Sequence, residues 1–174
     1  MMHPFRALLA AVAVLAAIPA ALAAQTLTDA NIVAIFDAAN TADIETGKLA
    51  VTSGAAKDIR ELGQSFADAH TSVRQQGRDL AKKLGVVPVL PASDQGAAQY
   101  AAAMTALKGK KGKAFDIAFL DHEIAYHQAV IDAVTKTLLP AIQNAELKAF
   151  VEKVAPAFVG HLEMAKSLRA KLGN

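Results

Sequence analysis

Three histidines and two acidic residues occupy positions where a bundle helix normally presents apolar side chains to its core. They are Asp43, His70, Glu123, His127 and His161. Neutral imidazole and carboxylate suit divalent zinc, iron, manganese or copper. The same groups can instead satisfy one another in a metal-free hydrogen-bond network. Either arrangement requires that they meet, because an unpaired polar group inside a protein core costs roughly several kcal/mol.

The helical repeat of about 100° per residue places these side chains on inward faces. His70 lies four residues after Phe66 in the apolar stripe of a helix expected over 57–84. In the helix expected over 114–138, a single seam has the spacing 4-3-4-3-4. It contains Asp116, Leu120, Glu123, His127, Val130 and Val134. Asp116 is a weaker candidate, as an acid that orients a ligand rather than binding metal itself.

Glycine, proline and capping residues set the limits of the expected helices. Thr28 is a suitable N-cap, and Gly85 and Gly173 are suitable C-caps. Pro140 should end one helix, and Pro156 should kink another. The expected helices cover residues 29–53, 57–84, 97–107, 114–138 and 144–172. The first two and the last two are joined tightly, and a long connection over 85–113 separates the pairs. We therefore expect an all-α, ferritin-like four-helix bundle with one long crossover that contains the short helix.

The depth of the polar residues along their helices supports one shared cluster. Asp43, His70, His127 and His161 each lie near the midpoint of a different long helix. Midpoints of packed helices meet at one level whichever way each helix runs. We therefore expect these four side chains to converge in one layer, with Glu123 one turn from His127.

Composition limits the other functions. The sequence has 174 residues, no cysteine and a net charge of +2. Thiolate metal sites and disulfides are therefore excluded, and the balanced charge argues against nucleic acid as a partner. Residues 1–23 have a basic start, an apolar run and a small-residue cleavage pattern. They are expected to be a secretory signal peptide, which leaves residues 24–174 as one periplasmic domain. The segment Lys108–Lys113 is read as a solvated loop, or alternatively as a weak contact for the membrane surface or other anionic parts of the envelope.

Two enzyme classes fit the spacing poorly. His122 and His127 are five residues apart, whereas the zinc-protease helix needs histidines four apart on one face. His122 should therefore be peripheral and face solvent. Di-iron carboxylate proteins use Glu-x-x-His pairs, but Glu123 stands four residues before His127. An oxidase of this type is the weakest alternative.

Four segments together resemble a ferritin-like bacterial family of unknown function, labelled as predicted periplasmic or outer-membrane proteins. They are Ala42–Ala50, Phe66–His70, Phe115–Phe119 with His127, and His161–Lys166. The resemblance spans nearly the whole mature chain and implies the fold and an envelope location, with no established activity. The family usually has Glu where this chain has Asp43, and Asp where it has Ala69.

These observations favour an exported helical protein that binds a divalent transition metal in its core. The first alternative is a metal-free structural or stress-response protein of the envelope, in which the polar cluster sets the register of the helices.

Overall fold

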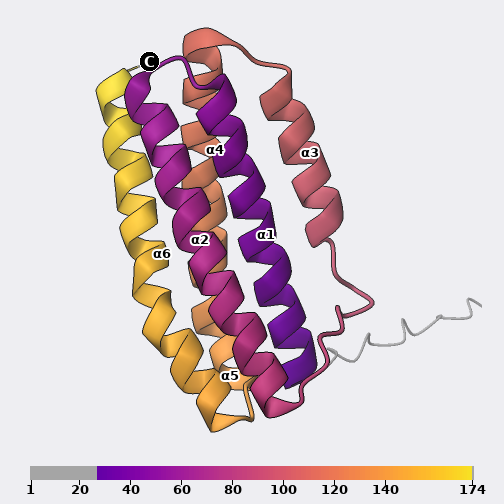
Figure 1. The fold of residues 1–174 in the computed structure, drawn as a ribbon. Helices are drawn as coiled ribbons and strands as arrows, with labels where there is room; N and C mark the ends of the chain where they lie inside the picture. Colours follow the sequence, from indigo (N-terminus) through magenta and orange to yellow (C-terminus); the bar gives the residue numbers. More distant parts are fainter. Residues whose placement is uncertain (1–26, 174) are drawn as a thin grey trace, which may run out of the picture.

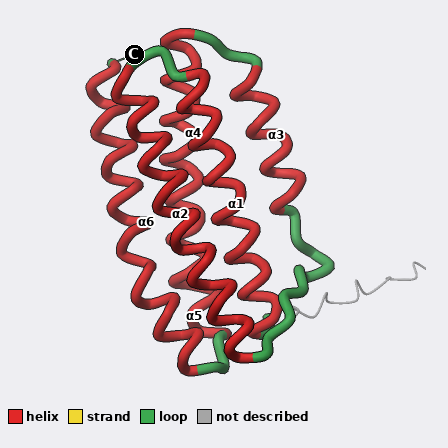
Figure 2. The backbone as a smooth tube through the Cα atoms, in the orientation of Figure 1, coloured by secondary structure: helices red, strands yellow, loops and turns green. Residues whose placement is uncertain are grey.

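The computed structural model describes residues 27–173, so the expected signal peptide lies outside the described residues. Within them the chain is helical and forms no strand (Figure 2). Four long helices lie side by side (Figure 1): α1 (Asp29–Ser53), α2 (Lys57–Leu84), α4 (Gly112–Ala133) and α6 (Ala145–Leu172). The shorter elements are α3 (Gly96–Lys108), the π-helix η1 (Val134–Leu138) and α5 (Leu139–Ala141).

The connections confirm the predicted architecture. Helices α1 and α2 form one antiparallel pair, and α4 and α6 form the other (Figure 1). Residues 85–111 carry the chain back along the bundle from the end of α2 to the start of α4, and α3 packs against α1 on the way. This is an all-α four-helix bundle with one long crossover, the ferritin-like arrangement.

The caps explain why the helices begin and end where they do. Thr28 and Asn31 form a reciprocal capping box at the start of α1. Gly85 ends α2 in the left-handed conformation, with φ 67°. At the start of α6, the Asn144 side chain accepts hydrogen bonds from the backbone N–H groups of Glu146 and Leu147. The α6 helix continues through Pro156 without a break.

The prediction of one regular helix ending before Pro140 is wrong. The α-helix gives way at Val134 to a five-residue π-helix, and helical structure continues through Pro140 to Ala141. At the end of the π-helix, the backbone N–H of Leu139 donates to the carbonyl of Val134, five residues earlier. Proline has no N–H, and its ring crowds the carbonyl four residues before it, so a locally wider turn accommodates Pro140 within the helix.

Two glycines allow α1 and α2 to approach closely. A Cβ atom placed on Gly63 would lie 2.6 Å from the Gly47 carbonyl oxygen and 2.7 Å from the Ala50 Cβ. A Cβ on Gly47 would meet the Gly63 carbonyl at 2.6 Å. Both distances are far too short for real contacts, so only glycine permits this crossing. Asp43 lies about one turn from Gly47 on α1, and His70 lies about two turns from Gly63 on α2.

Two buried or half-buried carboxylates fasten the ends of the bundle. Asp116 of α4 accepts hydrogen bonds from the backbone N–H groups of Ala55 and Ala56, at 2.8 and 2.9 Å, in the α1–α2 connection. Asp29 of α1 accepts from the N–H groups of Gln143 and Asn144, both at 2.9 Å, ahead of α6. Each carboxylate therefore joins one helical pair to the connection of the other.

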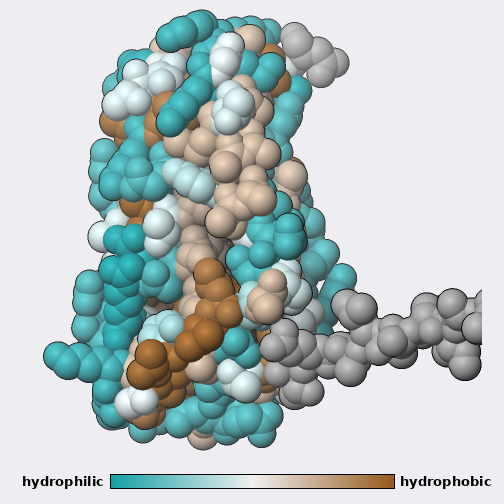
Figure 3. All heavy atoms as spheres, turned by 90° about the vertical axis from the view of Figure 1, so that its right-hand side faces the viewer, coloured by the Kyte–Doolittle hydropathy of each residue, from teal (hydrophilic) through white to brown (hydrophobic). Residues whose placement is uncertain are grey.

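The apolar core is divided into two parts, one toward each end of the bundle. One part includes Ile32, Val151 and Phe158, and the other includes Phe66, Phe115 and Leu120. Some apolar side chains remain on the surface: Figure 3 shows them along the face that carries α3 and the crossover. Val87, Val89 and Leu90 of the crossover are among these exposed residues. The polar cluster lies between the two apolar parts of the core.

Candidate metal centre

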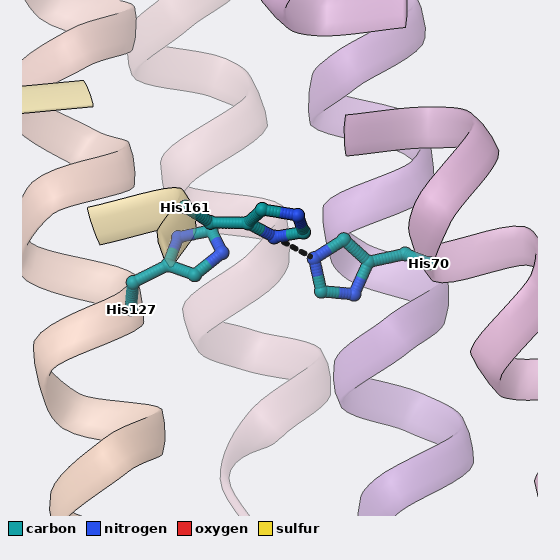
Figure 4. A group of neighbouring side chains, drawn as sticks. All are labelled: His70, His127 and His161. Carbon is teal, nitrogen blue, oxygen red and sulfur yellow. Dashed lines mark hydrogen bonds between the residues drawn. The ribbon is translucent and has the colours of Figure 1, made fainter. Parts of the chain in front are cut away.

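The five predicted residues are all buried, and their side chains converge. Their exposed fractions range from 0% for Glu123 to 7% for His161. The rings of His70, His127 and His161 approach one another from α2, α4 and α6 (Figure 4), with centroids 5.0 to 5.7 Å apart. Asp43 joins them from α1. The structure therefore brings together, at one level, residues from all four long helices.

A fixed amide orients the His70 ring. The Asn40 side-chain N–H donates to the carbonyl oxygen of Phe36 at 2.7 Å, which directs its Oδ1 toward Nδ1 of His70, 2.9 Å away. Because Oδ1 can only accept, Nδ1 of His70 carries the proton. In the neutral ring, Nε2 therefore has a free lone pair. This atom lies 2.9 Å from Oδ2 of Asp43.

A backbone carbonyl orients the His127 ring in the same way. Nδ1 of His127 lies 3.0 Å from the carbonyl oxygen of Glu123, one helical turn earlier. A carbonyl can only accept, so Nδ1 again carries the proton and Nε2 has the lone pair. Nε2 of His127 lies 3.4 Å from the same Oδ2 of Asp43 and has no hydrogen-bond donor.

Two imidazole lone pairs therefore face one carboxylate oxygen. Three acceptors cannot satisfy one another, and Oδ2 of Asp43 has no properly directed hydrogen bond. These facing acceptors require either an added proton, on an imidazole or on a carboxyl group, or a metal ion. The outer N–H bonds to a side-chain amide and to a carbonyl are the supports that metal-binding histidines generally have.

His161 supplies a further nitrogen. Its Nδ1 lies 3.1 Å from Nε2 of His70, the contact drawn in Figure 4. Phe66 packs on its ring, with centroids 4.5 Å apart. Burial, followed by the charges of His70 and His127, lowers the pKa of His161 to about 4. His161 is therefore neutral near pH 7 and has a nitrogen lone pair to offer.

The two acids of the cluster have opposite tendencies. Burial acts to raise the pKa of Asp43, but an additional proton on the facing imidazoles outweighs it and lowers the pKa, through hydrogen bonding and charge from His70 and then the charge of His127. Burial and then the charge of Asp43 raise the pKa of Glu123 well above its usual value. Asp43 is thus the anionic ligand candidate. Glu123, whose Oε2 lies 3.4 Å from Nδ1 of His127, is the acid that gives up its proton less readily.

Three distances between donor atoms are close to those around a small cation. With metal–ligand bonds of about 2.0 Å, neighbouring donors of a tetrahedral site lie about 3.3 Å apart. The contacts of Asp43 Oδ2 with the two Nε2 atoms and of His70 with His161 measure 2.9, 3.4 and 3.1 Å. The three histidines, and separately Asp43, Glu123 and His127, each place their donors within 4.8 Å of one another.

Other sequence expectations turned out differently. Asp116 is buried on the expected seam, but it caps the α1–α2 connection two turns from Glu123 and does not orient a ligand of the cluster. His122 was expected to face solvent, whereas it is half-buried and stacks on Tyr126 with centroids 5.7 Å apart. The helical periodicity correctly placed His122 away from the inner seam of α4.

Sequence reasoning missed two supporting residues. Asn40 lies three residues before Asp43 on the same face of α1, and this spacing could have identified it. Tyr126 donates a hydrogen bond to the Ala39 carbonyl at 2.8 Å and thereby ties α4 to α1 beside the cluster. No feature of the local sequence indicated that contact.

Comparison with known proteins places the chain by family alone. Residues 15–168 match the family described as Domain of unknown function (DUF4142). The chain belongs to this family. No curated protein and no solved structure matches the sequence or the fold at a significant level. The assignment of this DUF4142 protein's function must therefore rest on its own cluster.

Proposed function

We propose that this DUF4142 protein binds one divalent transition metal ion in its core, with Asp43, His70, His127 and His161 as ligands. One observation carries the proposal: two imidazoles, each fixed by an outer N–H bond, direct their lone pairs at a single carboxylate oxygen. Glu123 completes the set as a further ligand or as the group that holds His127 in place. Donors of this kind suit zinc, iron, manganese or copper.

A resident ion would satisfy the facing acceptors of the cluster and would link the two helical pairs. Asp43 and His70 come from the α1–α2 pair, whereas His127 and His161 come from the α4–α6 pair. Metal binding would therefore also stabilise the fold. The donor set differs from that of di-iron carboxylate proteins, which takes a carboxylate from each of two helices and a Glu-x-x-His pair from each of the others. We therefore do not propose an oxidase.

A metal-free structural role is the second candidate, and one contact favours it. His161 Nδ1–H can donate to Nε2 of His70 at 3.1 Å, so part of the cluster satisfies itself without an ion. Under this hypothesis, the cluster sets the register of the helices and an additional proton replaces the metal.

We further propose an exported, periplasmic location with attachment to the outer membrane as a variant, based on the leader pattern of residues 1–23. No helix among residues 27–173 is long and apolar enough to cross a membrane. The lysines between 108 and 113 are exposed at the end of α3 and the start of α4 and offer a weak contact for anionic envelope surfaces.

Metal content tests the proposal directly. The exported protein, purified without chelator or added metal, should contain about one equivalent of a transition metal by elemental analysis and native mass spectrometry. His127→Gln should abolish it. His122→Gln is the matched control, because it removes a histidine from the same helix outside the cluster. A metal-free wild type that also takes up no zinc, iron, manganese or copper after dialysis would refute the proposal.

A further inference from the structure

A narrow crevice of about 50 Å³ enters the bundle between α1 and α4 and ends at the cluster. Half-buried side chains form its outer part: Ile35, Ala39, Tyr126 and Val130. Buried Val134, Leu138 and Phe158 form its inner wall. Asp43, His70 and His127 lie at its inner end.

The π-helix helps to form this crevice. Val134 and Leu138 are its first and last residues, and both line the inner wall. Val134 still continues the seam predicted for α4, and the wider turn that begins there changes the direction of the side chains that follow it. π-turns occur frequently at functional sites, and here the turn lies directly beside the candidate ligands.

The walls of the crevice are apolar apart from its inner end. Tyr126 directs its hydroxyl to the Ala39 carbonyl, and Asn40 is held between Phe36 and His70, so both polar groups are already engaged. An ion entering this space would lose its hydration without gaining a partner. Dry apolar cavities instead take up small apolar guests.

The inner end offers unsatisfied atoms. Both carboxylate oxygens of Asp43 and Nε2 of His127 are buried without a hydrogen-bond partner, and both residues line the crevice. A guest that crosses the apolar walls would therefore arrive beside the proposed ligands of the metal.

We infer that the crevice admits a small neutral diatomic molecule, of the class of dioxygen or nitric oxide, to the centre of the cluster. Size and polarity together define this class: the space is too small for an organic substrate, and its walls exclude anions. The inference rests on the proposed metal site for what the guest meets at the inner end, whereas the crevice itself is present without metal.

Xenon tests the crevice in the metal-free protein. Dissolved xenon should shift the methyl NMR signals of Ile35, Val130 and Leu138 in a saturable manner. Ala39→Leu adds three carbons to the crevice wall and should reduce these shifts to less than about a tenth. Ala125→Leu is the control, because it adds the same group to an exposed position of α4. Should Ala39→Leu fail to fold, Ala133→Phe at the exposed rim replaces it. Absence of xenon-dependent shifts in the wild type overturns the inference.

Nitric oxide then tests the guest class at the loaded centre. Fe(II)-loaded protein should bind nitric oxide, as followed by absorbance in anaerobic stopped-flow, and Ala39→Leu should slow the association at least about tenfold. Azide, an anion of similar length, should not bind. Stoichiometric iron without nitric oxide binding, or equal rates in wild type and Ala39→Leu, contradicts the inference and leaves the metal site intact. If the protein takes up no iron, xenon still decides the crevice, and the uptake of zinc, manganese and copper decides the proposed function separately.

Discussion

Replacing Asp43 by asparagine separates the metal hypothesis from the metal-free one. Asparagine keeps the shape of the side chain and removes its charge. It can also donate an N–H to Nε2 of His70, the atom that lies 2.9 Å from Oδ2 of Asp43 in the wild type. The metal-free protein should therefore change its melting temperature by less than about 2 °C, because a hydrogen bond replaces the charged contact.

Metal binding should respond much more strongly to the same substitution. Loss of the Asp43 carboxylate should weaken zinc affinity about 100-fold or more, since supporting residues alone are typically worth 10- to 100-fold. At saturating zinc, a 100-fold loss removes about 2.7 kcal/mol of stabilisation. For a domain of this size, that lowers the melting temperature of the zinc-loaded protein by roughly 5–10 °C.

The assay is thermal unfolding of wild type and Asp43→Asn, each with zinc and with chelator. We expect a large zinc-dependent increase in melting temperature for the wild type and a much smaller one for the variant. If the variant instead loses about 3–5 kcal/mol equally with zinc and with chelator, the carboxylate acts as one half of a buried ion pair. That result would refute the reasoning from the facing lone pairs.

Three further predictions concern the pH dependence of stability and the contacts that hold the bundle together. Because the pKa of His161 is lowered to about 4, the unfolded chain binds more protons than the native state between about pH 6.5 and pH 4. Stability should fall as pH decreases through that window, and His161→Gln should flatten the profile in denaturant titrations. Gly63→Ala should destabilise the fold by about 1–3 kcal/mol or more, because the added methyl group clashes with Gly47. Gly160→Ala is the control: it lies in open space on α6 and should stabilise the fold by up to about 1 kcal/mol. Equal effects of the two substitutions on the free energy of unfolding would contradict the close helix crossing. Asp116→Asn should lower the melting temperature through loss of charged caps worth about 1–2 kcal/mol while leaving metal content unchanged, and a drop in metal content would show that it acts on the cluster.

Helix periodicity and midpoint depth were sufficient to predict the bundle and the meeting of the five polar residues. Both signals depend on regular geometry within single helices, which the sequence encodes directly. The close crossing at Gly47 and Gly63 depends on two helices at once, and no local pattern predicts it. The same is true of Asp116, whose inward position was correct but whose partners are backbone groups of another connection.

The orientation of the imidazoles could not be predicted either. It depends on which atom of Asn40 faces His70 and on a carbonyl of α4, and periodicity does not determine such details. The π-helix was missed because Pro140 indicates a helix end in sequence, whereas a widened turn lets the helix continue past it. Two residues of that missed turn, Val134 and Leu138, line the crevice.

The placement of the cluster between the two helical pairs has a kinetic consequence. An ion held there touches both pairs, and the apolar crevice offers it no hydrated route to the outside. Release would require the α1–α2 pair to separate from the α4–α6 pair, so the lifetime of the bound metal would be set by how often the bundle opens. Such a protein would retain its ion for long periods even in surroundings where free metal is scarce.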